Sequence, residues 1–134
     1  MQERELTQRI IEAAQETKAE EIVLFNMDSR SPFTDFVIIC TGRSQAHVRG
    51  IADNIEAALK EVGQRALAQE GYQEGSWVLM DFNIAIVHIF HPETRAYYNL
   101  EELLQDYPRE DIAEDGTARQ VDPTPTRNTA AAQS

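Results

Sequence analysis

The chain has 134 residues, of which 42% are hydrophobic and 26% charged, and its formal net charge is −11. This length and composition suit one domain with its own core, and they exclude a fibrous or wholly disordered chain. The excess of acid excludes the basic surface with which nucleic-acid-binding proteins displace counterions from phosphates, so we expect no direct sequence-specific contact with nucleic acid.

Most of this charge lies before residue 108, where 18 acidic side chains accompany 9 basic ones. The imbalance therefore belongs to the part of the chain that we expect to fold. Such a surface is attracted to a basic partner, and the attraction acts mainly on encounter rate and specificity. Charge alone leaves open the simpler interpretation that the acidic surface serves solubility.

The single cysteine, Cys40, lies in the apolar run 36–40 and is expected to pack as a small hydrophobic side chain. One cysteine cannot form an internal disulfide, which fits a reducing compartment. Residues 1–5 lack the apolar stretch of a signal peptide, and no apolar run approaches membrane-spanning length. We therefore expect a cytoplasmic protein that does not enter a membrane.

The first half of the chain predicts two helices and two strands. Apolar residues share one helical face over 3–18, and the short apolar runs 22–25 and 36–41 are typical of buried strands. The strongest helical pattern lies between Ser44, a suitable N-cap, and Gly63, a suitable stop.

The second half predicts a short extended piece over 66–69 and then two β-rich runs, 77–80 and 84–90. The three residues between the two runs indicate an antiparallel hairpin, with Asn83 at the turn position that needs positive φ. A short helical stretch follows over 97–104. These elements predict an α/β or α+β fold, with helices packed on a mixed sheet of about five strands.

From Pro108 onward the chain loses periodicity and becomes rich in Pro, Thr and Ala. This composition predicts a disordered tail over 108–134. The folded domain is therefore expected to span 1–107.

Two short motifs resemble ligand sites but favour structural interpretations. The turn 41–44 joins a strand to a helix N-terminus, yet it has one glycine and no following Lys, so a tight turn is favoured over a phosphate loop. His88 and His91 are three apart on a strand, where they point to opposite faces, and zinc sites need three or four ligands. A histidine within the sheet is favoured over a metal ligand.

The carboxylates show no catalytic pattern. Asp28, Asp35, Asp53 and Asp81 lie on separate predicted elements, and no Asp-x-Asp pair, nucleophile turn or dinucleotide fingerprint occurs. We expect no catalytic residues, no metal and no cofactor. A nucleotide-binding enzyme that uses the 41–44 turn and these aspartates with Mg²⁺ remains the alternative, because folding can bring distant groups together.

Aromatic residues gather around the hairpin and the following helix, beside carboxylates. The group comprises Trp77, Phe82, Tyr97 and Tyr98, with Asp81 and Glu101. Trp and Tyr are large, rigid anchors that often dominate binding interfaces, and neighbouring carboxylates suit a partner rich in Lys and Arg. The pattern alone leaves open, with equal weight, whether these rings only pack the edge of the sheet.

Several segments, in this order and spacing, form a recognisable pattern between about residue 5 and residue 107. They are residues 34–44, 47–48, 51–55, 70–71, 77–82, 87–90 and 95–101. Together they resemble the ribosomal silencing factors, also called the RsfS or iojap family.

The resemblance implies a three-layer α/β/α fold, similar to that of nucleotidyltransferases but without their catalytic motif. It also implies binding to ribosomal protein L-fourteen on the large subunit, which sterically blocks joining of the small subunit and represses translation when nutrients are scarce. Members of the family are linked to large-subunit assembly as well. A homodimeric scaffold that buries the same aromatic residues against its own copy is the other alternative.

The family's aromatic positions match Trp77, Phe82 and Tyr98, which favours the interface interpretation. The expected partner-binding residues are Trp77, Met80, Asp81, Phe82, Tyr97, Tyr98 and Glu101. Two positions depart from the family pattern: Ile84 stands where an acidic residue is usual, and Leu104 stands where a Trp is usual.

Overall fold

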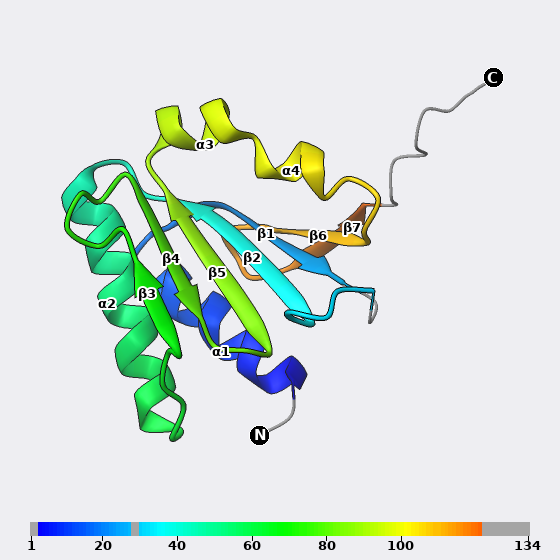
Figure 1. Ribbon diagram of the computed structural model, residues 1–134, viewed down its shortest axis with the longest axis horizontal. Coiled ribbons are helices and arrows are strands. Elements are labelled where there is room, and N and C mark those ends of the chain that lie inside the picture. The colour runs from blue at the N-terminus through cyan, green and yellow to red at the C-terminus, as the bar shows by residue number, and fades with distance from the viewer. Residues whose placement is uncertain (1–2, 28–29, 122–134) are drawn as a thin grey trace.

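The computed structural model describes residues 3–27 and 30–121, which form one sheet with helices on its two faces (Figure 1). The elements follow one another as α1 (Glu3–Glu16), β1 (Glu20–Asn26), β2 (Phe36–Thr41), α2 (Gln45–Glu61), β3 (Ala68–Glu70), β4 (Trp77–Asp81), β5 (Ala85–Phe90), α3 (Pro92–Tyr98), α4 (Leu100–Leu103), β6 (Arg109–Ile112) and β7 (Ala118–Val121).

The strands lie in the order β3-β4-β5-β2-β1-β6-β7. Strands β2 and β5 pair in parallel, and the other neighbours are antiparallel. The α/β class and the mixed sheet are therefore confirmed, with seven strands in place of the expected five. The β4–β5 hairpin is also confirmed, and Asn83 has the positive φ of 74° expected at its turn.

Strands β6 and β7 correct the prediction that the chain is disordered from residue 108. β6 continues the sheet from β1, with Leu24 opposite Glu110, and Ile112 packs against the core. The sequences of these strands, REDI and ARQV, each contain only one strongly apolar residue, so they lack the apolar pattern that predicts a buried strand. Both strands pair through backbone hydrogen bonds, which the side-chain pattern does not indicate. Residues 122–134 of the predicted tail lie outside the described residues.

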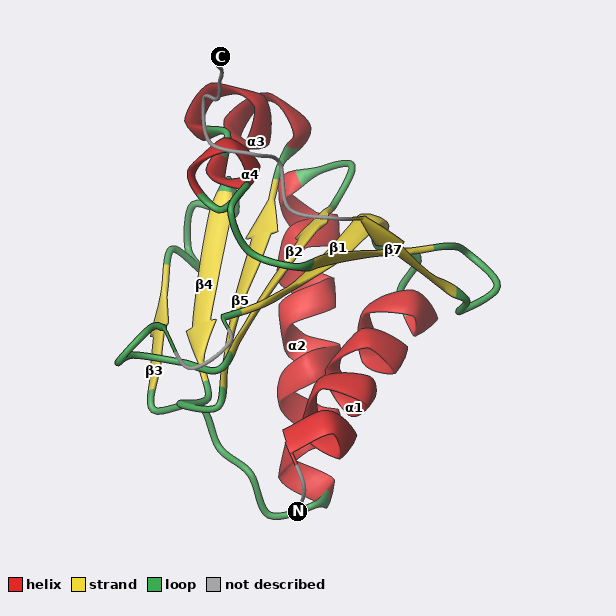
Figure 2. Ribbon diagram, turned by 90° about the vertical axis from the view of Figure 1, so that its right-hand side faces the viewer, coloured by secondary structure: helices red, strands yellow, loops and turns green. Residues whose placement is uncertain are grey.

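Helices α1 and α2 cover one face of the sheet (Figure 2). Their apolar faces meet the sheet through fully buried side chains such as Ile10 of α1 and Ile55 of α2. Ser44 caps α2, because its hydroxyl accepts the backbone N–H of His47 at 3.0 Å. The 41–44 segment is thus the capped turn that the sequence favoured.

The opposite face is only partly covered. A second core of apolar residues from β1, β2 and β5 packs there against Leu100, Leu104 and Tyr107. Helices α3 and α4 lie over one end of this face, which completes the three layers (Figure 2). In the described part of the chain, no helix lies on this face over β3 or over β4 beyond its start at Trp77. An uncovered sheet face is a surface that a partner can reach.

Cys40 has no solvent exposure, which confirms its packing role. Within residues 3–27 and 30–121, no helix combines the length and the apolar character needed to cross a membrane.

Candidate functional site

The two exposed tyrosines lie at the end of α3, and a helix break fixes their position. Helix α3 begins at Pro92, directly after the N-cap residue His91, and Pro is well suited to the first turn of a helix. Asn99 then adopts a left-handed conformation with φ of 48° and ends α3, and α4 begins at the next residue. Tyr97 is 81% exposed and Tyr98 49% exposed. The break therefore holds two aromatic rings at the surface.

These tyrosines join a cluster of rings from β4 and β5, and we call Trp77, His88, Phe90, Tyr97 and Tyr98 the aromatic cluster. The hairpin register places Trp77 opposite Phe90, with ring centroids 4.9 Å apart. The ring of Tyr98 lies 4.7 Å from that of Trp77, and Tyr97 meets Tyr98 edge-on at 5.0 Å. Such tilted contacts are favourable, so α3 and the hairpin support each other.

His88 holds the indole of Trp77 in place. The Trp77 Nε1–H donates to Nδ1 of His88 at 3.1 Å, and burial lowers the pKa of His88 to about 4. An indole nitrogen only donates, so Nδ1 must accept and the imidazole must be neutral. His88 is thus a histidine within the sheet, as the sequence favoured, with a structural partner.

Arg95 fastens α3 and α4 to the sheet. Its guanidinium is buried and donates to the backbone carbonyl of Glu21 at 2.8 Å and to the hydroxyl of Thr41 at 2.7 Å. Its Nε and Nη2 both donate to one carboxylate oxygen of Glu101, at 3.0 and 2.7 Å. The carboxylate of Glu101 is therefore paired inside the protein and is not a free acidic group for a partner.

The predicted site residues divide between the two faces of the sheet. Met80 is fully buried and Phe82 is 4% exposed, and both lie in the core beneath α1 and α2. Side chains alternate along a strand, so Met80 faces away from Trp77. Asp81 lies at the far end of β4, where its carboxylate accepts the N–H of Asn83 at 2.8 Å. Only Trp77, Tyr97 and Tyr98 of the predicted set come together at the surface.

A hollow opens beside these three rings. It is lined by Glu74, Ser76, Trp77, Glu93, Thr94, Tyr97 and Tyr98. The sequence reasoning missed its two carboxylates, Glu74 and Glu93, although the signal was available. A hairpin that pairs residues 77 and 90 also brings together the residues before 77 and after 90, and the His91 N–H donates to the Ser76 carbonyl at 2.9 Å.

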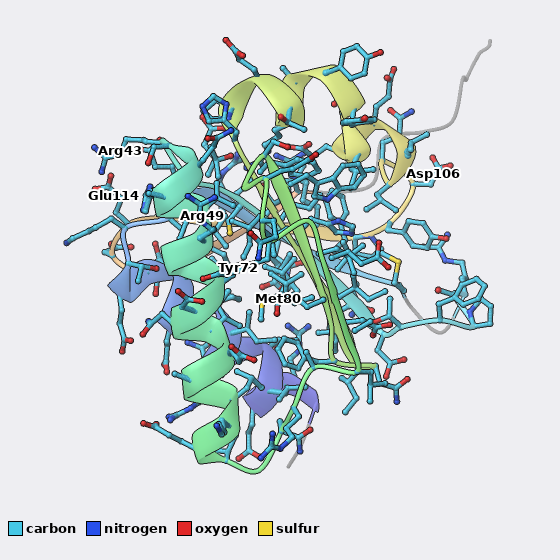
Figure 3. The ribbon with its side chains drawn as sticks, turned by 60° about the vertical axis from the view of Figure 1, so that its left-hand side comes forward. Arg43, Arg49, Tyr72, Met80, Asp106 and Glu114 are labelled. Atoms are coloured by element: carbon cyan, nitrogen blue, oxygen red, sulfur yellow. The ribbon has the colours of Figure 1, made fainter. Side chains whose placement is uncertain are left out.

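The loop that carries Glu74 is held against α2. The Tyr72 hydroxyl donates to the carboxylate of Asp53, whose oxygens lie 2.9 and 3.0 Å away, and Arg49 donates to the carbonyl of Gln73 at 3.1 Å. Figure 3 shows Arg49 and Tyr72 on the same side of α2. At Gly71 a Cβ would lie 1.9 Å from the carbonyl oxygen of Trp77, so only glycine fits where the loop passes β4.

The described residues offer no metal centre. None of them form a group of three or more His, Cys, Asp or Glu side chains suited to a metal ion.

Comparison with known proteins gives the family. The model of the family described as "Ribosomal silencing factor during starvation" matches residues 1–134. The chain belongs to the ribosomal silencing factor family. A ribosomal silencing factor RsfS from Halalkalibacterium halodurans is 41% identical over 108 residues, which cover 81% of this chain and 92% of that protein.

Two further relatives extend the family match. The chloroplastic protein Iojap of Zea mays is 35% identical over 96 residues, covering 69% of this chain and 40% of that protein. A crystal structure of a Chromobacterium violaceum protein superimposes with a TM-score of 0.76 at 31% identity, covering 78% of this chain and 87% of that one. The fold and the sequence therefore agree on the family.

The two positions at which the resemblance implies other residues lie beside the two cores. Ile84 is partly buried and packs against the core beneath α1 and α2. Leu104 packs against the core beneath α3 and α4. In this family member both positions therefore contribute to packing.

Proposed function

We propose that this protein is a ribosomal silencing factor that binds ribosomal protein L-fourteen on the large subunit through the surface rings of the aromatic cluster, Trp77, Tyr97 and Tyr98. While bound, the folded domain fills space that the small subunit needs, so joining is blocked and translation is repressed. This function requires a binding surface and the volume of the folded domain, but it requires no catalysis. It places the protein in the cytoplasm, with the ribosomes.

The exposure of Tyr97 and Tyr98 beside Trp77 is the observation that carries this proposal. Exposed tyrosines next to a half-buried tryptophan, at the edge of a partly uncovered sheet face, are typical of an interface anchor. Aromatic rings lose little conformational entropy on binding, so they supply buried area at low cost.

Charge supports a protein partner over RNA. The net charge of −11 repels phosphate backbones and attracts a basic protein surface. Because such steering acts between exposed charges, binding should weaken as salt is added. The protein would therefore reach a basic ribosomal protein while avoiding extensive contact with the surrounding rRNA.

The test is co-sedimentation of the purified protein with isolated large subunits, followed by addition of small subunits. We expect wild type to pellet with large subunits and to reduce the yield of joined ribosomes. Tyr98→Ala should weaken binding by on the order of 2 kcal/mol. Phe33→Ala, which removes a ring that is 77% exposed and lies outside the aromatic cluster, is the matched control.

Circular dichroism must show that each variant is folded. If folded Tyr98→Ala binds like wild type, the aromatic cluster is not the interface. If wild type forms a dimer in solution that Tyr98→Ala abolishes, and does not bind large subunits, the homodimeric scaffold replaces this proposal.

A further inference from the structure

We propose that the hollow beside Trp77 receives the guanidinium group of one arginine side chain of the protein partner. The identity of the partner rests on the function proposed above, whereas the preference for a guanidinium group is inferred from the residues that line the hollow. The residues that carry the argument are Trp77, Tyr97 and Tyr98 as walls and Glu74 and Glu93 as charges.

The two carboxylates of the hollow are available to an incoming cation. Glu74 and Glu93 are both exposed, and neither forms a salt bridge with any residue in the described part of the chain. They follow from the two strands at the open end of the hairpin, Glu74 before β4 and Glu93 after β5 at the start of α3. A cation between them would be attracted by both carboxylates.

The aromatic walls favour a cation that is also flat. The rings of Tyr97 and Tyr98 are nearly perpendicular, at 87°, so they form a corner with faces in two directions. A guanidinium can stack on one face while its N–H groups point to carboxylates at the side, whereas an ammonium is a compact point charge with stronger hydration. The hydroxyls of Ser76 and Thr94 offer further acceptors.

The protein's own nearby guanidinium groups are already engaged. Arg95 is buried against Glu101 and Thr41, and Arg49 donates to the Gln73 carbonyl on the α2 side of the loop. No Lys or Arg among the described residues lines the hollow, so a basic side chain of another molecule can occupy it. An arginine that projects from a basic protein surface meets the requirements of both charge and shape.

The hollow can be tested without the ribosome, because Trp77 is the only tryptophan in the chain and gives one indole signal. We would titrate the full-length ¹⁵N-labelled protein with N-acetyl-arginine amide and follow that signal by NMR. A single cation–π and carboxylate contact is weak, so the ligand must reach tens of millimolar. N-acetyl-citrulline amide, which has the same shape without the charge, and N-acetyl-lysine amide are the comparison ligands.

We expect the chemical shift of the Trp77 indole signal to change on addition of the arginine amide, to change less with the lysine amide and to remain unchanged with the citrulline amide. In the double variant Glu74→Gln/Glu93→Gln the arginine response should fall. No movement with arginine, or an equal response to citrulline, would overturn the site, and a lysine response as large as that of arginine would overturn the choice of arginine.

The same double variant tests the hollow on the partner. Its affinity for large subunits should fall about tenfold or more, which corresponds to about 1.4 kcal/mol. The control Glu12→Gln/Glu56→Gln removes the same charge from exposed positions of α1 and α2 and should bind within twofold of wild type. Equal weakening of both variants would reduce the effect to net charge and overturn the site. If wild type itself fails to bind large subunits, the proposed function fails, while the titration still decides the hollow.

Discussion

The indole of Trp77 and the imidazole of His88 are joined by a hydrogen bond of 3.1 Å that requires His88 to be neutral. The bond lies on the open face of the sheet, where Trp77 also contacts Tyr98 of α3. A titratable group therefore holds the central ring of the aromatic cluster, and this couples the stability of the cluster to pH.

We expect acid to destabilise the protein through His88. Burial lowers the pKa of His88 from 6.5 to about 4, so in the range between these values only the unfolded chain binds the proton. This contribution to stability is complete above about pH 6.5, falls as the pH decreases and levels off below about pH 4. The free energy of unfolding should drop by about 2 kcal/mol between pH 7.5 and pH 5.

The measurement is urea denaturation at several pH values, on wild type and on His88→Gln. Glutamine can still accept the indole N–H but does not titrate, so its curve should be flatter over this range. Parallel curves for the two proteins would show that other groups cause the acid sensitivity.

The Arg95–Glu101 pair should fix the helices of the site. Glu101→Gln keeps the shape but removes the charge from two hydrogen bonds of a buried guanidinium, so unfolding should become easier by about 2 kcal/mol. Glu102→Gln, on an exposed neighbour, should change stability by less than about 0.5 kcal/mol. Thermal melts give the stability, and a change in Trp77 fluorescence would show that α3 has moved. Equal melting temperatures of the two variants would contradict the role of the Arg95–Glu101 pair.

How much of this site the sequence could predict depends on the range of each interaction. The capped helix after Ser44 and the turn at Asn83 are local, so their residues alone predicted them. Alternation along β4 also contained the information that Met80 faces away from Trp77, and the prediction that placed both residues in one site did not use it.

Other features depend on contacts that no local pattern records. Glu101 meets Arg95 because Asn99 breaks the helix between them, and a continuous helical pattern hides that break. Strand β6 forms by pairing onto β1, which lies more than 80 residues earlier in the chain, and β7 then pairs onto β6. Backbone pairing at that separation depends on the finished sheet, so composition predicted a tail there.

The two faces of β4 should separate stability from binding. Met80→Ala leaves a cavity in the core and should cost on the order of 3 kcal/mol of stability, while the folded fraction binds large subunits as wild type does. Tyr97→Ala removes an exposed ring and should change stability by less than about 0.5 kcal/mol while weakening binding. Denaturation gives the free energy of unfolding of each variant, and co-sedimentation gives its affinity for large subunits. A folded Met80→Ala protein with weakened binding would place the interface on the other face.

The folded domain should extend through β7. A chain that ends at Val121 keeps the β1–β6 and β6–β7 ladders and should melt like the full chain. A chain that ends at Tyr107 leaves β1 as an edge strand and removes Ile112, which packs against the core, so it should lose several kcal/mol and tend to aggregate. Thermal melts and light scattering compare the two. Equal stability of the two chains would restore the boundary at residue 107.

The thiol of Cys40 should be inert in the folded protein. Burial raises its pKa from 9.0 to about 12, although the charge of Arg95 opposes the shift in part. At a given pH this leaves about a thousandfold less thiolate than an exposed cysteine has, and the buried sulfur is also out of reach of reagents. Reaction with a thiol-specific chromophore at pH 8 should therefore be slow in buffer and fast in denaturing urea. A rapid reaction without urea would show that β2 opens to solvent, which is incompatible with a rigid central strand beneath α2.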